Sequence, residues 1–338
     1  MTQLDYGISA EIVRIAVVVG VVISVLFYER FHLTTGGAIV PGYLAIGLIN
    51  PLSVVVTLLA GSLTYVIVHG MVLKRRIIYG RRLFELEVLI GLGFILVTTV
   101  VAGVLGDIDP TWAGIAGIGF LVPGIIAHDM GRQGVQRTLL ATGVTTALLG
   151  AAIFLLEAIF SLLPGSTGKV VELSSQIGFP AELLLLAVAV SVIAGTLLFQ
   201  HRGIRSGGFI TGAYLGLVSS RLADVAFVAG VAVITWFLVT KILMPRLMLF
   251  GRRKLSAMLM VGALVAWGLE LILRWATDMA YSPWLGLTVA PLLVPALVAN
   301  DAERQGWANT LWGVAMTTSA VFAVTNLVAA GATAGGLL

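Results

Sequence analysis

The 338-residue sequence contains no cysteine. A disulfide, a thiolate nucleophile and a cysteine-ligated metal site are therefore excluded, and cysteine usage says nothing about the redox compartment. The N-terminal residues also lack the basic segment and the small-residue cleavage site of a signal peptide. We therefore expect the first apolar run to be a retained helix.

Charge is scarce as well. Only 11% of the residues are charged and 59% are hydrophobic, whereas soluble domains are about 25% charged. A soluble chain of this length would need polar surface that this sequence does not supply. No long hydrophilic block is present either, so no soluble catalytic domain is expected. The composition predicts an all-α polytopic integral membrane protein.

The motifs of common enzymes are missing too. The stretch 165–169 (GSTGK) lacks the first glycine that a G-x-x-x-x-G-K-[ST] phosphate loop requires. No Ser-His-Asp or zinc pattern is found, and the four histidines show no metal-ligand spacing. These histidines are His32, His69, His128 and His201. We expect no cofactor, no metal, no nucleic-acid partner and no catalytic activity of the chain alone.

Apolar runs alternate along the chain in the order long, short, long, four times over. They cover about 12–28, 36–49, 52–73, 83–105, 112–127, 138–163, 181–199, 207–218, 225–243, 255–273, 284–299 and 310–330. The short runs fall below the ~20 residues of a usual transmembrane helix. They could therefore cross the membrane or enter and leave it on one side.

The basic residues favour crossing. If all twelve runs cross and the N-terminus lies outside, 16 of the 20 Lys and Arg residues fall in cytoplasmic loops. If the short runs re-enter, the best assignment places only 12 inside and 8 outside. The positive-inside rule therefore favours about twelve transmembrane helices in the plasma membrane, with both termini outside.

The chain also repeats itself. Gly80–Arg82 returns as Gly251–Arg253, and Arg132–Gly134 returns at nearly the same spacing as Arg304–Gly306. A weaker repeat lies inside each half, and in the first half Val40–Gly42 recurs as Val122–Gly124. Units of three crossings that follow one another have opposite orientations, which is the inverted-repeat arrangement of transporters. The predicted organisation is a first repeat at 1–163, a linker at 164–180 and a second repeat at 181–338.

The short runs carry residues that interrupt helices. Proline removes a backbone donor, and glycine adopts backbone angles that other residues avoid. In hydrocarbon the released backbone groups need new partners from neighbouring helices or a wet cavity. We expect these short segments to expose backbone groups at depth in the membrane. The residues concerned are Pro41, Gly42, Tyr43, Pro123, Gly124, Gly212 and Pro295.

Arginines gather on the predicted cytoplasmic side. They can be topology determinants near anionic lipid, or they can bind a polyanion or a partner enzyme, because arginine pairs bind carboxylates bidentately. The charged pair at the end of the first run can be a local ion pair or part of a gate. The candidate residues are Arg81, Arg82, Arg252, Arg253, Arg132, Arg304, Glu29 and Arg30.

The first half carries a set of short motifs in order. These are FYER (27–30), IVPGYLA (39–45), YGRR (79–82), PGIIA (123–127) and RQG (132–134). With these motifs the chain resembles the poly-γ-glutamate biosynthesis membrane protein family PgsC/CapC. A usual family member has about the length of this half, so the chain resembles two fused units. The second half departs from the pattern, since Tyr79 becomes Phe250 and Gly124 becomes Ala296. We expect its fold to be kept, whereas equal function of the two halves is not implied.

The resemblance implies a membrane subunit of a polyglutamate synthase in a bacterial cell membrane. Its expected partners are membrane lipid, a cytoplasmic ATP-dependent ligase (PgsB/CapB-like), an extracytoplasmic accessory subunit (PgsA/CapA-like) and an anionic polymer such as poly-γ-glutamate. We hypothesise that the chain supports polymerisation and passes the polymer outwards. Two alternatives stay open, namely a secondary transporter of a small solute and a non-conducting membrane anchor for the ligase.

Overall fold

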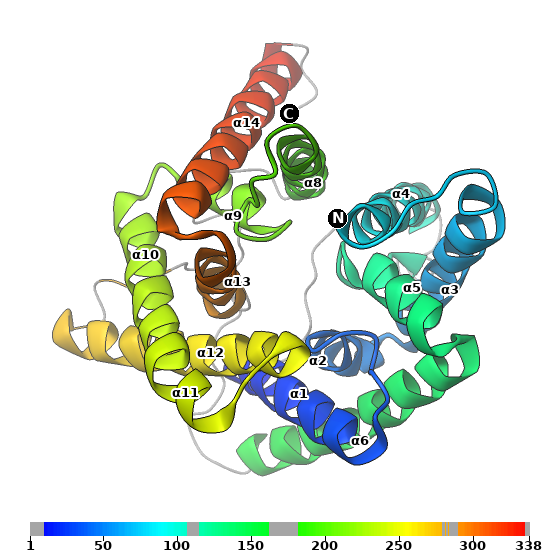
Figure 1. Ribbon diagram of the computed structural model, residues 1–338, viewed down its shortest axis with the longest axis horizontal. Coiled ribbons are helices and arrows are strands. Elements are labelled where there is room, and N and C mark those ends of the chain that lie inside the picture. Colours follow the sequence, from blue (N-terminus) through cyan, green and yellow to red (C-terminus); the bar gives the residue numbers. More distant parts are fainter. Residues whose placement is uncertain are drawn as a thin grey trace. The chain divides into compact units, whose positions relative to one another are not determined.

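The computed structural model describes residues 10–106, 115–161, 182–278, 281, 283 and 290–334. Within these ranges the regular structure is entirely helical. The chain divides into two compact units, residues 1–170 (unit 1) and 171–338 (unit 2). The boundary falls in the predicted linker, which lies outside the described residues. In Figure 1 the colours run from blue to green through unit 1 and from green to red through unit 2.

Each unit repeats the predicted order of long, short and long helices. Unit 1 contains α1 (Ala10–Phe31), α2 (Val40–Ile46), the 3-10 turn η1 (Gly47–Ile49), α3 (Pro51–Ile67) with its π-helical extension η2 (Val68–Val72), α4 (Arg81–Gly106), α5 (Val122–Gln133) and α6 (Val135–Ser161). Unit 2 contains α8 (Glu182–Arg202), α9 (Thr211–Val218), α10 (Leu222–Phe237) with its π-helical extension η4 (Leu238–Leu243), α11 (Met244–Leu247), α12 (Gly251–Ala276), α13 (Ala290–Gln305) and α14 (Trp307–Ala334).

Helices pack in threes inside each unit. In unit 1, α1, α2 and α6 contact one another, and α3, α4 and α5 form a second group. In unit 2 the corresponding groups are α8, α9 and α14, and α10, α12 and α13. The third helix of each sequence repeat thus packs with the first two helices of the other repeat. This exchange agrees with the inner repeat that the sequence predicts.

The helix surfaces are those of a polytopic membrane protein. Seven helices in the described ranges are long and apolar enough to cross a membrane, three in unit 1 and four in unit 2. Large apolar side chains such as Leu59, Leu140 and Leu264 are exposed on the long helices, whereas Thr57 and Thr138 are fully buried. Outward apolar side chains with small and hydroxylated residues between helices are typical of packing in lipid.

The short run 36–49 is not one helix. Residues 36–39 are irregular, α2 has seven residues, and η1 has three. At 1.5 Å per residue α2 is only about 10 Å long, far less than the ~30 Å hydrocarbon core. A helix this short cannot span the hydrocarbon core, and irregular backbone within that core would need partners inside the protein.

Proline marks where short helices begin. Pro41 and Pro123 lie in the first turns of α2 and α5, where a missing N–H costs little because it would have no helical partner. The interruption therefore precedes each of these prolines. Pro295 differs, since α13 begins at Ala290 and holds it in its interior.

Candidate functional site

A glutamine clamp fixes the irregular chain between α1 and α2. The side-chain oxygen of Gln133 accepts a hydrogen bond from the Thr34 backbone N–H at 2.8 Å. Its amide nitrogen donates to the Thr34 carbonyl at 2.6 Å and to the Thr138 hydroxyl at 3.0 Å. Gln133 thereby pairs with backbone as a neighbouring strand would, and it ties the end of α1 to the α5–α6 turn.

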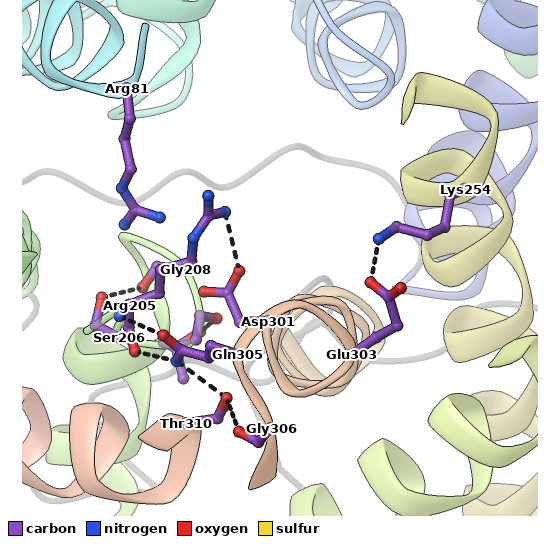
Figure 2. Close-up of polar contacts among 12 residues, drawn as sticks. Arg81, Arg205, Ser206, Gly208, Lys254, Asp301, Glu303, Gln305, Gly306 and Thr310 are labelled. Carbon is purple, nitrogen blue, oxygen red and sulfur yellow. Dashed lines mark hydrogen bonds and ion pairs between the residues drawn. The ribbon is translucent and has the colours of Figure 1, made fainter. Parts of the chain in front are cut away.

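Unit 2 builds the same clamp with Gln305, as Figure 2 shows. The Arg205 N–H donates to Gln305 Oε1 at 2.8 Å, while Gln305 Nε2 donates to the Arg205 carbonyl at 2.9 Å and to the Thr310 hydroxyl at 3.0 Å. The guanidinium of Arg205 also lies 3.7 Å from the carboxylate of Asp301. The repeated RQG motif thus acts through its glutamine, and its arginines, Arg132 and Arg304, are exposed.

Two glycines shape the clamped segment. Gly36 and Gly37 have φ values of 76° and 109°, and Gly207 and Gly208 have 74° and 106°. Residues with a Cβ rarely adopt these angles. The hydroxyl of the preceding residue closes each turn, since Thr35 Oγ1 donates to the Gly37 carbonyl at 3.2 Å and the matching serine makes the equivalent bond in unit 2 (Figure 2). Each unit therefore holds the same glycine-dependent turn in front of its short helix.

Close helix crossings account for the glycines of the short helices. A Cβ on Gly42 would lie 3.1 Å from the Cα of Val17, and one on Gly124 would lie 2.5 Å from the Cα of Val88. In unit 2 a Cβ on Gly212 would lie 2.8 Å from the Ser191 hydroxyl. Tyr43 is half-buried and packs on an apolar cluster that includes Val40 and Leu44. These residues let short helices approach long ones closely, which is a packing role.

The predicted arginines gather at one end of each unit. Glu29 and Arg30 are exposed in the last turn of α1, and Arg132 is exposed near the end of α5, which the clamp holds beside the end of α1. Arg81 and Arg82 begin α4. Arg81 donates from Nε to Glu85 at 2.8 Å, whereas Arg82 is exposed. In unit 2, Arg252 is half-buried, and Arg253 and Arg304 are exposed.

A buried carboxylate lies at the same end of unit 1. Glu87 on α4 is fully buried, and its two oxygens lie 2.9 Å from His69 Nε2 and 2.7 Å from His128 Nδ1. The His69 ring stacks on Tyr65 at 4.6 Å, and the His128 ring contacts Phe84 at 4.9 Å. This network (the His–Glu–His cluster) joins the end of α3, the start of α4 and α5. Sequence reasoning missed it because its members lie on different helices and far apart in the chain.

Unit 2 places different chemistry at the matching positions. Thr240, Met258 and Asn300 stand where unit 1 has the first histidine, the glutamate and the second histidine. Lys254 instead forms an ion pair with Glu303 (Figure 2). Unit 1 could not hold both the His–Glu–His cluster and a residue equivalent to Glu303. Gly131 occupies the position that matches Glu303, and a Cβ on Gly131 would lie 2.5 Å from the His69 ring.

The other end of unit 2 holds a second polar group. Tyr281 donates from its hydroxyl to Asp224 at 2.7 Å, and Arg221 lies 3.3 Å from the same carboxylate. Burial, followed by the hydrogen bond and the charge of Asp224, raises the pKa of Tyr281, and Arg221 opposes this rise. Unit 1 has Asn50 and Ser53 where unit 2 has Arg221 and Asp224. The other end of unit 2 therefore carries a polar group that unit 1 does not reproduce at the matching positions.

Among the described residues, no three His, Asp or Glu side chains are placed to hold a metal ion. What both units share is a clamped turn, a short helix and exposed guanidinium groups at one end. Such an end suits contact with a carboxylate-rich partner.

One protein-family model matches both units. The sequence model of the family described as "Capsule biosynthesis CapC" matches residues 19–139 and again residues 190–311. "PGA biosynthesis protein CapC" of Bacillus subtilis (strain 168) is 36% identical over 140 residues, which are 40% of this chain and 91% of that protein. "Capsule biosynthesis protein CapC" of Bacillus anthracis is 38% identical over 149 residues, which are 44% of this chain and 95% of that protein. No solved structure matches.

Proposed function

Because this chain belongs to the capsule biosynthesis CapC family, with the family domain present twice, we propose that it is the membrane subunit of a complex that makes poly-γ-glutamate and passes it across the bacterial cytoplasmic membrane. The observation that carries the proposal is the double family match, since each match covers a unit with its own glutamine clamp. The B. subtilis relative's name assigns that protein to PGA biosynthesis.

The geometry supports contact with an acidic polymer. Arg82, Arg132, Arg253 and Arg304 are exposed at the end of each unit where the clamp lies. Guanidinium groups bind carboxylates in a bidentate manner, and a γ-linked glutamate chain offers one carboxylate per residue. With this end in the cytoplasm, a negative interior would favour export of the polymer by about 2.3 kcal/mol per charge per 100 mV.

The proposed division of labour needs partners. A cytoplasmic ATP-dependent ligase, PgsB/CapB-like, would form the amide bonds and dock at the arginine-bearing end. An extracytoplasmic subunit, PgsA/CapA-like, would receive the polymer on the far side. Support for this division is indirect: the sequence lacks a phosphate-binding loop.

Substitution of the exposed arginines tests the proposal. Replacing Arg82 and Arg253 with Gln should reduce secreted polymer strongly, while Lys at both positions keeps the charge that fixes topology but loses the bidentate fork. Polymer in the medium and protein in the membrane are measured together. If the Gln variant secretes normally, guanidinium contact with the polymer or ligase is refuted. If Lys restores secretion fully, charge alone suffices.

Cysteine labelling tests the orientation of the chain in the membrane. Because the chain has no cysteine of its own, only the introduced cysteine would react. Single cysteines at Asn50 and Arg132, both exposed, should react from opposite sides of the membrane, with Arg132 cytoplasmic. Labelling of both positions from one side would contradict the crossing of the short segments.

The exchanged helix groups also favour a second candidate, a secondary transporter of a small solute, because inverted repeats with irregular short segments are typical of transporters. Uptake of a defined solute into proteoliposomes without any ligase would support that function. Co-purification with the ligase but no passage of polymer would support a non-conducting anchor.

A further inference from the structure

The His–Glu–His cluster has no role in the arginine contacts proposed above, although it contains a fully buried carboxylate. Glu87 lies about two helical turns inside α4, and both of its oxygens are occupied by imidazole nitrogens. Buried ionisable groups inside membrane proteins are costly and mark functional sites by default, proton relays among them.

The hydrogen positions in the cluster follow from an ionised Glu87. An ionised carboxylate only accepts hydrogen bonds, so His69 donates from Nε2 and His128 donates from Nδ1. Each neutral ring then has a lone pair on its other nitrogen, Nδ1 of His69 and Nε2 of His128. The two side chains are 21% and 26% exposed, so these nitrogens belong to partly accessible rings. A carboxylate that holds an imidazole by one nitrogen leaves the other nitrogen in position to take up a proton.

The charge of the cluster depends on how many protons it holds. With Glu87 ionised and both rings neutral the net charge is −1, and one added proton on either ring makes it zero. A second proton makes it +1. Neither added proton breaks an N–H bond to Glu87, so the three residues stay in place while the sign of the charge changes.

Other charged groups lie on the elements around the His–Glu–His cluster. Those on the elements packed against it are Arg81, Arg82 and Glu85 on α4, Asp129 and Arg132 on α5, Lys74, Arg75 and Arg76 after η2, and Arg137 on α6. Arg81 and Glu85 pair with each other at 2.8 Å. Unit 2 has no ionisable group at the three matching positions, so only unit 1 contains the His–Glu–His cluster.

We propose that His69, Glu87 and His128 form a proton-binding site that sets the charge met by the acidic polymer where it enters unit 1. The negative charge of the unprotonated site weakens the attraction of the surrounding arginines and lysines for the polymer's carboxylates, and protonation removes this opposition. Acceptance of the polymer then increases as the cytoplasmic side becomes more acidic. This inference rests on the proposed function for its polymer, whereas the proton site itself does not.

Spectroscopy of the full-length chain tests the site directly. The chain has only four histidines, so ¹⁵N-labelled imidazoles can be resolved in protein held in lipid nanodiscs. At high pH, His69 should show the Nε2–H tautomer and His128 the Nδ1–H tautomer, and the two should titrate as a coupled pair. In Glu87→Gln the amide donates one bond and accepts one, so one of the two rings should change tautomer. The exposed His32 and His201 serve as internal controls.

The second half supplies the residues for a matched variant of the cluster. His69→Thr, Glu87→Met and His128→Asn together give unit 1 the residues that unit 2 carries at these positions. Membrane vesicles containing the ligase and ATP would be assayed for polymer across a pH series, with the wild-type chain and this triple variant. The ratio of the two outputs removes the ligase's own pH dependence. We expect wild-type output to rise relative to the variant as pH falls.

The possible results are distinguishable. Rings that titrate independently and ignore Glu87→Gln overturn the proton site. A coupled pair combined with identical pH profiles overturns its effect on the polymer and leaves the proposed function intact. Polymer output that does not depend on this chain at all refutes the proposed function and the effect of the cluster on the polymer. The spectroscopic test of the proton-binding site is unaffected by that result.

Discussion

Loss of the Gln133 side chain should destabilise unit 1 measurably. Gln133→Ala removes three hydrogen bonds and leaves the Thr34 N–H and carbonyl without their partner. Side-chain hydrogen bonds in membrane proteins average about 0.6 kcal/mol, so three give about 2 kcal/mol. Leaving a sheltered backbone group unsatisfied adds about 1–3 kcal/mol. The expected loss is therefore about 3–5 kcal/mol in the free energy of unfolding.

Unfolding by SDS in mixed micelles, followed by circular dichroism, measures this loss. Gln133→Glu is the matched control, because a carboxylate still accepts from the Thr34 N–H but cannot donate to the carbonyl, so an intermediate loss is expected. Gln305→Ala should repeat the effect in unit 2, where the same three bonds are present. A single cysteine at position 34 should react faster with maleimide in the Gln133→Ala background. Unchanged unfolding together with unchanged labelling would refute the clamp.

Three further outcomes follow from the packing and the ion pairs. Gly124→Ala should cost about 1–3 kcal/mol of stability because its Cβ would meet the backbone of α4, whereas Gly93→Ala, with nothing within 4 Å, should be neutral or slightly stabilising in the same SDS assay. Lys254→Leu should destabilise unit 2 by about 1–3 kcal/mol, and adding Glu303→Gly, which completes the unit 1 pattern, should recover part of that loss in a double-mutant cycle. Tyr281→Phe should cost about 1–2 kcal/mol at pH 7. Because the pKa of Tyr281 is raised in the folded chain, this difference should persist to pH 10 and shrink above it, as pH-dependent unfolding would show.

Patterns of apolar residues predicted much of the fold. The alternation of long and short runs predicted the order of helices, and the recurrence of the RQG motif predicted that Gln133 and Gln305 occupy equivalent places. Both follow from local patterns, which a sequence displays directly. The packing of α6 with α1 and α2 was not predicted, because the inner repeat indicated only that successive units have opposite orientations.

The candidate site was harder to predict, because its contacts join residues far apart in sequence. The repeated RQG motif drew attention to its arginines, but the glutamine makes the contacts, and only the recurrence of a threonine shortly after each glutamine could have indicated this. Nothing local pairs Glu87 with two histidines on other helices. Arg81, expected to contact polymer, lies within hydrogen-bonding distance of Glu85, which an i,i+4 spacing permits but does not require.

Reconstitution tests the central claim most directly. Proteoliposomes that contain this chain oriented with its arginine-bearing end outward would receive the ligase, ATP and glutamate on the outside. We predict that polymer accumulates in the lumen, protected from an added depolymerase, and only when the chain is present. Polymer that stays entirely outside, with the chain inserted and the ligase active, would contradict a conducting role.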